Sequence, residues 1–149
     1  MDKVNIEGVI LTPLNKISHP KGDIFHGIKK TDIGYSGFGE AYFSIIKNNE
    51  IKGWKKHKKM IMNLIVPIGS VSFVLYDDRK DSSSRNSFFP VTLSQENYKR
   101  LTIPKGVWHA FRGNCSDPNM ILDIANMEHD PNEIVKIPLD EMTFDWDAL

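Results

Sequence analysis

Alternation of apolar and polar residues is the dominant pattern along the chain, and it predicts β-strands. The clearest run is EAYFSII at residues 40–46, which a polar turn closes. A shorter strand, followed by a proline-broken turn, is expected within residues 4–18. No segment keeps a helical period for long. Similar runs predict further strands near residues 51–58, 60–67, 70–77, 88–93, 99–103, 107–112 and 120–127.

This pattern indicates an all-β fold. About eight to ten short strands, with turn signals every eight to twelve residues, are typical of a sandwich or barrel rather than of alternating βαβ units. We therefore expect one domain over residues 1–149 with the architecture of a jelly roll, in which two sheets face each other across a pocket. The segments 31–39 and 78–87 are expected to be loops, and the tail 130–149 shows no helical period.

Composition narrows the function classes. Of 149 residues, 40% are apolar and 26% are charged, and the formal net charge of zero argues against a nucleic-acid partner. The single cysteine, Cys115, excludes an internal disulfide and fits a reducing compartment. No apolar run approaches the ~18 residues of a membrane span, and the first residues lack the apolar stretch of a signal peptide. We expect a soluble, cytoplasmic protein with no membrane partner.

Candidate chemistry gathers in two strands. Lysines crowd the segment around His57, and His109 follows a Pro-x-Gly turn in a later strand. Because residues two apart in a strand share a face, Lys55, His57 and Lys59 point one way, together with Asn63 if the strand continues. Facing inward, these groups require an anionic ligand or carboxylate partners. Facing outward, they form a solvated strand edge, and the residue pattern leaves both possibilities open.

Other kinds of site are weaker candidates. Asp123 alternates with apolar neighbours, so it faces either the same cavity or solvent. A metal site needs three or four ligands, and Lys55 beside His57 would repel a divalent cation, so we expect no metal. Cys115 has no histidine at motif spacing, and no glycine-rich phosphate or dinucleotide motif occurs, so we expect neither nucleophilic catalysis nor a cofactor.

Several segments, in this order, resemble two related groups of enzymes. KGWKKHK at residues 52–58 is similar to the Arg-Gly-x-His-x-His-Lys stretch of the cupin-type sugar-nucleotide ketoisomerases. IPKGVWHAF at residues 103–111 resembles the Ile-Pro-x-Gly-x-x-His-Gly-Phe of the dTDP-4-dehydrorhamnose 3,5-epimerases. Residues 69–79 are similar to their Gly-x-Val…Asp-x-Arg strand pair, and residues 129–133 and 144–146 to their closing Tyr-x-Pro-x-x-Glu and Asp-Trp elements.

The resemblance implies a cupin-like double-stranded β-helix, usually a homodimer, whose substrate is a nucleotide-diphosphate sugar with a 4-keto-6-deoxy group. It also implies chemistry without a metal or cofactor. A base removes the proton beside the ketone, and an acid returns a proton or stabilises the enolate. By position, Lys52 and Arg79 would hold the diphosphate, because cations pair with phosphate oxygens.

The resemblance also suggests individual roles. His57 matches the second histidine of the ketoisomerase pair, and His109 matches the pocket histidine of the epimerases. Asp140 falls near the aspartate that orients the catalytic histidine. Their places in or beside the same strands, rather than family roles, add Lys59, Asn63, Asp123 and Trp108 as candidate substrate-binding residues.

Two departures from the family pattern bear on activity. Lys55 stands where the family has its expected base, a histidine, and His129 stands where the epimerases have a tyrosine. Lys55 could still act as a base if burial and neighbouring cations lowered its pKa. The sequence therefore favours a sugar-nucleotide epimerase or isomerase of surface-polysaccharide synthesis, with catalysis by His57, Lys55, His109, Asp140 and His129. The alternative is a non-catalytic homologue that binds a sugar nucleotide.

Overall fold

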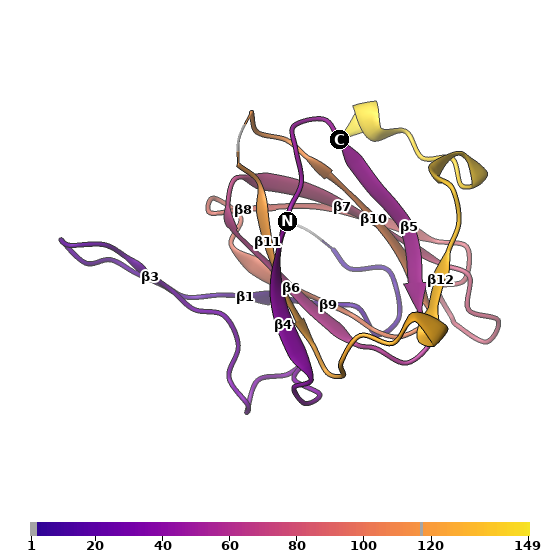
Figure 1. Ribbon diagram of the computed structural model, residues 1–149, viewed down its shortest axis with the longest axis horizontal. Coiled ribbons are helices and arrows are strands. Elements are labelled where there is room, and N and C mark those ends of the chain that lie inside the picture. The colour runs from indigo at the N-terminus through magenta and orange to yellow at the C-terminus, as the bar shows by residue number, and fades with distance from the viewer. Residues whose placement is uncertain (1–2, 117) are drawn as a thin grey trace.

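Two five-stranded antiparallel sheets lie face to face in the computed structural model, which describes residues 3–116 and 118–149 (Figure 1). The first sheet runs in the order β1 (Ile10–Pro13), β9 (Lys99–Ile103), β6 (Met62–Ile68), β11 (Met120–Ala125) and β4 (Glu40–Ile45). The second runs in the order β12 (Ile134–Lys136), β5 (Ile51–His57), β10 (Val107–Gly113), β7 (Ser70–Asp77) and β8 (Phe88–Ser94). The predicted all-β jelly roll is confirmed.

Smaller elements lie outside the two sheets. A hairpin of β2 (Lys16–Ile17) and β3 (Ile24–Phe25) extends away from them (Figure 1). The tail holds three single-turn 3-10 helices, η1 (Pro131–Glu133), η2 (Leu139–Glu141) and η3 (Trp146–Ala148). The sequence did not predict β12, because it is three residues long and lies in a tail interrupted by prolines. In the described part of the chain, no helix has the length and apolar character needed to cross a bilayer.

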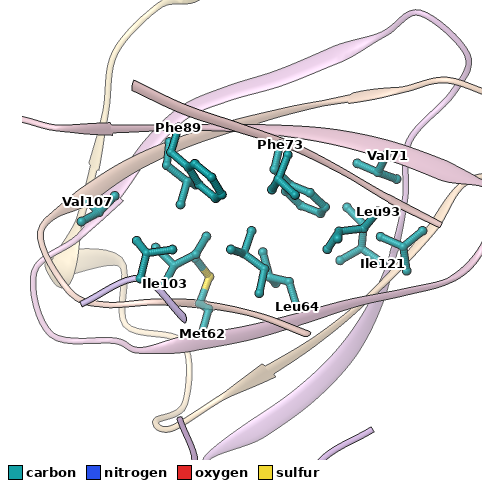
Figure 2. Close-up of a cluster of buried hydrophobic side chains, with 14 of the residues drawn as sticks. Met62, Leu64, Val71, Phe73, Phe89, Leu93, Ile103, Val107 and Ile121 are labelled. Atoms are coloured by element: carbon teal, nitrogen blue, oxygen red, sulfur yellow. The ribbon is translucent and has the colours of Figure 1, made fainter. Parts of the chain in front are cut away.

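The main core fills the space between the sheets. Figure 2 shows Phe73 and Phe89 of the second sheet facing Met62 and Leu64 of the first. Each of these side chains is at most 4% exposed, and every one comes from an alternating position of its strand. At ~25 cal/mol per Å² of buried apolar area, contacts of this kind dominate the stability of the sandwich. The period-two pattern of the sequence therefore decides which face of each strand turns inward.

A second apolar cluster covers the opposite face of the second sheet. Trp54, which is 1% exposed, packs there with Trp108 and Val74. Trp146 from the C-terminal tail lies against Trp54 at a ring-centroid distance of 6.4 Å. The tail, drawn in yellow, accordingly runs beside β5 and β12 (Figure 1). It closes the sheet from outside and leaves the inner side of β5 free for the site.

The outer face of the first sheet is fastened by a buried arginine. Arg100 is fully buried, and its guanidinium donates to the carbonyls of Gly27 at 2.8 Å and Ile33 at 3.0 Å. Its Nε donates to the side-chain oxygen of Asn63 at 3.1 Å. This network holds the segment around residues 27–34 against β6 and β9. The same network binds the side chain of Asn63, which therefore lies on the outer face of the sandwich.

Candidate active site

A cavity of about 210 Å³ opens between the two sheets and receives side chains from both. The second sheet supplies what we call the basic wall, from β5 and β10: Lys52, Lys55, His57 and His109. The first sheet supplies what we call the acidic wall, Tyr42 of β4 and Asp123 of β11. Apolar side chains, among them Met62, Leu64 and Phe73, line the rest. A concave site with a few convergent polar groups on an apolar lining is typical of small-molecule binding.

A β-bulge in β5 turns two lysines of the basic wall into the cavity. Lys55 pairs with His109 of β10, and Lys52 pairs with Phe111. Three residues of β5 therefore span the same length as two residues of β10. Residues three apart in a regular strand face opposite sides, so the extra residue is what brings both lysines to one side. Gly53 stands at the bulge because a Cβ there would lie 2.4 Å from the Cβ of Ala110.

His57 is held by a carboxylate that comes from outside its strand. Its Nδ1 lies 2.5 Å from Oε2 of Glu133, and both side chains are buried. The other carboxylate oxygen, Oε1, accepts the backbone N–H groups of Lys59 at 3.1 Å and Met60 at 2.8 Å. Burial alone would raise the pKa of Glu133, but these hydrogen bonds outweigh it and lower that pKa. An ionised Glu133 accepts a hydrogen bond from the Nδ1–H group of His57, so the free lone pair of the ring lies on Nε2.

The two histidines of the basic wall are neutral at neutral pH. Burial lowers the pKa of His57 and outweighs the opposing hydrogen bond to Glu133. Burial lowers the pKa of His109 to about 3, and Lys55 and a protonated His57 act in the same direction. The two rings stack, with centroids 5.9 Å apart and planes 7° apart. A neutral imidazole with a free lone pair, held in position by a stacked neighbour, has the properties of a general base.

Lys55 is the half-buried cation of the basic wall. Burial is the largest cause that lowers its pKa, followed by the facing Lys136, whereas Asp123 and Glu133 raise it. Lys55 therefore interacts electrostatically with both walls of the cavity. An ammonium group partly removed from water acts strongly on negative charge that develops beside it.

The acidic wall is a single cross-strand pair. Tyr42 and Asp123 are register partners on β4 and β11, and the tyrosine hydroxyl donates to Oδ2 of Asp123 at 2.7 Å. Asp123 is 5% exposed, and burial raises its pKa to about 6. Its Oδ1 is buried and has no hydrogen-bond partner within residues 3–116 and 118–149. The cavity thus holds a carboxyl group that burial drives toward its protonated form.

Four predicted site residues line this cavity on the basic wall, and Asp123 joins them from the acidic wall. Lys52 lines the cavity and also an adjoining groove outside it, and its ammonium donates to the carbonyl of Ile45 at 2.9 Å. The possibility that Lys55 and His57 face solvent, which the sequence left open, does not match the structure. Asp123 likewise faces the cavity, which the sequence could not decide.

Lys59 and Asn63 do not reach the cavity. β5 ends at His57, and Lys59 lies exposed in the bend that follows. The strand phase changes across this bend, so Met62 and Leu64 face inward while Asn63 faces outward to Arg100. The strand does not continue past His57, so the condition under which Asn63 would share the face of Lys55 is not met.

Arg79 and Trp108 also lie elsewhere. Nε and Nη2 of Arg79 donate to the buried carboxylate of Asp77 at 2.9 and 3.0 Å. The guanidinium is therefore already paired with an anion. Trp108 neighbours His109 in a strand and therefore faces the opposite side, where its indole donates to Asp78 at 2.9 Å. Neither residue lines the cavity, and neither placement fits the substrate-binding role that was predicted.

Asp140 and His129 are the remaining predicted catalytic residues, and both are exposed. Asp140 lies in η2 and does not line the cavity, so the histidine-orienting role belongs by geometry to Glu133. The backbone N–H of His129 donates to Glu40 at 2.7 Å, and its side chain lies near enough to His57 to lower the pKa of that histidine slightly. The position that holds a tyrosine in the epimerases does not line the cavity here.

Sequence reasoning missed Tyr42 and Glu133. Glu133 is 76 residues from His57 in the chain, and only its place in the closing motif 129–133 gave a signal. Tyr42 lies on the same strand face as Ser44, in the strand with the clearest alternation, so a cavity-facing position could have been proposed.

The donor set of the cavity does not favour a metal. No group of three or more histidine, cysteine, aspartate or glutamate residues in the described ranges is arranged to hold one. The Nδ1 of His57 is already occupied by Glu133, and Lys55 adds a cation beside the second histidine.

Comparison with known proteins gives one consistent family. The family described as dTDP-4-dehydrorhamnose 3,5-epimerase matches residues 3–149. The spore coat polysaccharide biosynthesis protein SpsL of Bacillus subtilis (strain 168) is 30% identical over 147 residues, which cover 96% of this chain and 97% of that protein. The probable low-salt glycan biosynthesis epimerase Agl13 of Haloferax volcanii is 25% identical over 114 residues, 72% of each chain.

Solved structures agree with these relatives. The crystal structure of a dTDP sugar isomerase from Desulfovibrio desulfuricans G20 superposes with a TM-score of 0.92 at 31% sequence identity. The match covers 97% of this chain and 94% of that one.

Proposed function

The chain belongs to the dTDP-4-dehydrorhamnose 3,5-epimerase family, and from this premise we propose that it epimerises a nucleotide-linked 4-keto-6-deoxy sugar. The reaction class is isomerisation, as in the rest of the family. The names of SpsL and Agl13 support a place in the synthesis of a surface polysaccharide or glycan. The sugar would enter the cavity with the carbons next to its C4 ketone between the basic and the acidic wall.

The observation that carries this proposal is the buried pair of His57 and Glu133 in the cavity. A proton beside a ketone is removed by a base of near-neutral pKa that lies within hydrogen-bond reach. His57 supplies such a base at Nε2, because Glu133 fixes the tautomer and burial lowers the pKa of the ring, which favours its neutral form. The C–H bond breaks, its electron pair forms the enolate, and His57 becomes the imidazolium that Glu133 stabilises.

The lysines of the basic wall suit the two negative charges of the complex. Lys55 is partly removed from water and faces the cavity, so it stabilises the enolate oxygen. Lys52 is exposed where the cavity meets the adjoining groove, so it binds the diphosphate. His109 is neutral and stacked on His57, and it keeps that ring in place.

The non-catalytic alternative rested on Lys55, which stands where the family has a histidine. The pair of His57 and Glu133 supplies a base two residues further along β5 and thereby removes the reason to expect inactivity. The family match over residues 3–149 likewise favours the enzyme over the non-catalytic homologue.

We also propose that the enzyme works as a homodimer in the cytoplasm. β4 is an edge strand whose Phe43 and Ile45 are 66% and 45% exposed, and Ile33 and Phe38 add 78% and 65% exposed side chains. Phe43 and Ile45 share one face of this edge strand, and adjoining exposed apolar side chains are candidates for coverage by a partner. A Phe43→Asp variant would then sediment as a monomer at concentrations at which the wild type sediments as a dimer. The free Cys115 supports a reducing compartment.

Solvent exchange tests the proposed reaction. Proton NMR in D2O follows C3 and C5 of a dTDP-linked 4-keto-6-deoxyglucose with wild type, with His57→Asn and with a surface control, Glu141→Gln. The proposal predicts that wild type and the control exchange these protons and that His57→Asn slows the exchange by roughly 1,000-fold. Undiminished exchange with His57→Asn would remove His57 as the base. If none of the three proteins exchanges these protons while the nucleotide sugar still binds, the result would support the non-catalytic alternative.

A further inference from the structure

Tyr42 and Asp123 have no part in removing the proton, yet they face the same cavity as His57 from the other sheet. Inverting a carbon requires that the proton leave from one face of the sugar and that a proton arrive on the opposite face. A base on one wall alone returns the proton to the face it came from. The cavity therefore needs a proton donor on the wall that faces His57.

Ordinary structural reasons do not account for the acidic wall. Asp123 is 5% exposed, and among the described residues its carboxyl group accepts a single hydrogen bond, from Tyr42. The second carboxyl oxygen is buried without a partner in the described part of the chain. A buried polar atom left unpaired has lost its hydrogen bonds to water without replacement, so the pair lowers the stability of the fold. Groups that fold at such a cost inside a cavity are candidates for function.

We infer that Tyr42 delivers the proton to the carbon on the face opposite His57, and that Asp123 resupplies Tyr42. This inference rests on the proposed epimerase function. The hydroxyl of Tyr42 is 2.7 Å from Oδ2 of Asp123, which is a distance for direct proton transfer between the two oxygens. The two residues are register partners, so neighbouring backbones fix their contact without help from a loop.

The transfer balances in protons and electrons. The enolate carbon forms a C–H bond with the proton of the Tyr42 hydroxyl, and the electron pair of that O–H bond stays on the phenolic oxygen. The phenolic oxygen then takes the carboxyl proton of Asp123, which becomes the carboxylate. The imidazolium of His57 releases one proton to water and Asp123 takes one up, so the enzyme returns to its starting state with no net change.

The electrostatics of the acidic wall agree with this sequence. Burial raises the pKa of Asp123 to about 6, with Glu40 acting in the same direction, while Tyr42 and the facing Lys55 act against it. Asp123 is therefore a carboxyl group that can hold a proton near neutral pH. Burial and Asp123 also raise the pKa of Tyr42, so the phenol keeps its proton until a strongly basic carbon accepts it.

Inversion and exchange separate this role from a structural one. The variants are Tyr42→Phe and Asp123→Asn, with Tyr76→Phe as the matched control, because the Tyr76 hydroxyl bonds Asn86 outside the cavity. Each protein is incubated with the 4-keto sugar nucleotide in D2O, and NMR records both deuterium uptake and the configuration at C3 and C5. We expect Tyr42→Phe to keep exchange within a few fold of wild type while inversion falls roughly 100-fold or more. Asp123→Asn is expected to shift the two rates in the same unequal way.

Several outcomes would overturn the inference. Equal losses of exchange and inversion would mean a structural role or a role in base catalysis, and a rise in KM with unchanged kcat would mean that the pair only binds the sugar. Unchanged inversion in Tyr42→Phe would place the donor elsewhere. Failure of the proposed function itself looks different, because then wild type shows no exchange at either carbon.

Discussion

The basic wall and the acidic wall face one cavity, but the fold stabilises their polar groups to very different degrees. Glu133 behind the basic wall accepts three hydrogen bonds, and it fixes His57 in one tautomer. Asp123 on the acidic wall accepts one, from Tyr42, and its other oxygen is buried and unpartnered within the described residues. One carboxylate is held ionised by its surroundings, whereas the other is driven toward its protonated form.

This difference prepares acid and base at the same pH. Burial lowers the pKa of His57 and raises the pKa of Asp123 to about 6. A histidine that stays neutral and a carboxyl group that holds its proton then coexist near neutrality, as a reaction with one proton removed and one delivered requires. The positive charge of Lys55 acts on both groups, because it lowers the pKa of His57 and that of Asp123.

The largest effect is expected when the support of the basic wall is changed. In Glu133→Gln the amide can donate to Nδ1 of His57, which moves the ring proton to Nε2 and removes the lone pair from the cavity. We expect kcat to fall roughly 1,000-fold or more, as when the orienting carboxylate of a catalytic triad is replaced by an amide. Solvent exchange and inversion should fall together, because both need the base.

The surface variant Glu141→Gln is the control for this change, since Glu141 lies exposed in η2 and does not line the cavity. A Glu133→Gln enzyme with near-wild-type exchange would show that His57 does not depend on its carboxylate.

A smaller loss is expected when the charge between the walls is removed. Lys55→Met keeps most of the side-chain volume but takes the ammonium away from the enolate oxygen. We expect kcat to fall roughly 100-fold, the usual cost of one lost oxyanion donor. Lys56→Met is the matched control, because Lys56 points to the other side of β5 and pairs with Asp78 at 3.3 Å. Steady-state kinetics of the two variants measure the difference, and equal values of kcat would contradict the role given to Lys55.

The last effect concerns stability rather than rate, and it sharpens the contrast between the two carboxyl groups. Asp123 has its pKa raised from 3.8 to about 6 in the folded protein, so the unfolded chain releases this proton first as pH rises. Stability contributed by protonated Asp123 is therefore lost between about pH 4 and pH 6. Asp123→Asn does not titrate, and at pH 8 it should be more stable than wild type by up to about 3 kcal/mol.

Urea unfolding of wild type and Asp123→Asn at pH 4 and pH 8 measures this effect. The gain should be near zero at the acid pH and present at the alkaline pH. A gain that is the same at both pH values would mean that the carboxyl group is not destabilised by its charge.

Much of the fold could be read from the sequence, because alternation sets both the strands and their inward faces. The strands near residues 40–46, 70–77 and 107–112 are confirmed as β4, β7 and β10. The same rule separates His109 from Trp108, since adjacent strand residues face opposite sides. The prediction that His109 and Trp108 both belong to the site did not apply this rule.

The site was harder to predict because it depends on breaks in the alternation. The bulge at Gly53 brings Lys52 and Lys55 to the same side, and the bend after His57 reverses the phase at Asn63. No local sequence pattern predicts the bulge or the bend. The partner of His57 lies in a three-residue helix of the tail, where contact over 76 residues of sequence decides the pairing.

Isotope retention in a single turnover tests the central claim, that the two walls act on opposite faces of the sugar. The substrate carries deuterium at C3 and C5, the solvent is H2O, and the reaction with excess wild-type enzyme is stopped at low conversion. We predict that the inverted product has lost its deuterium at each inverted carbon, while the recovered substrate keeps it, because delivery from Tyr42 is faster than return from His57. Product that retains the substrate deuterium at an inverted carbon would show that one group both removes and returns the proton, and it would contradict the account.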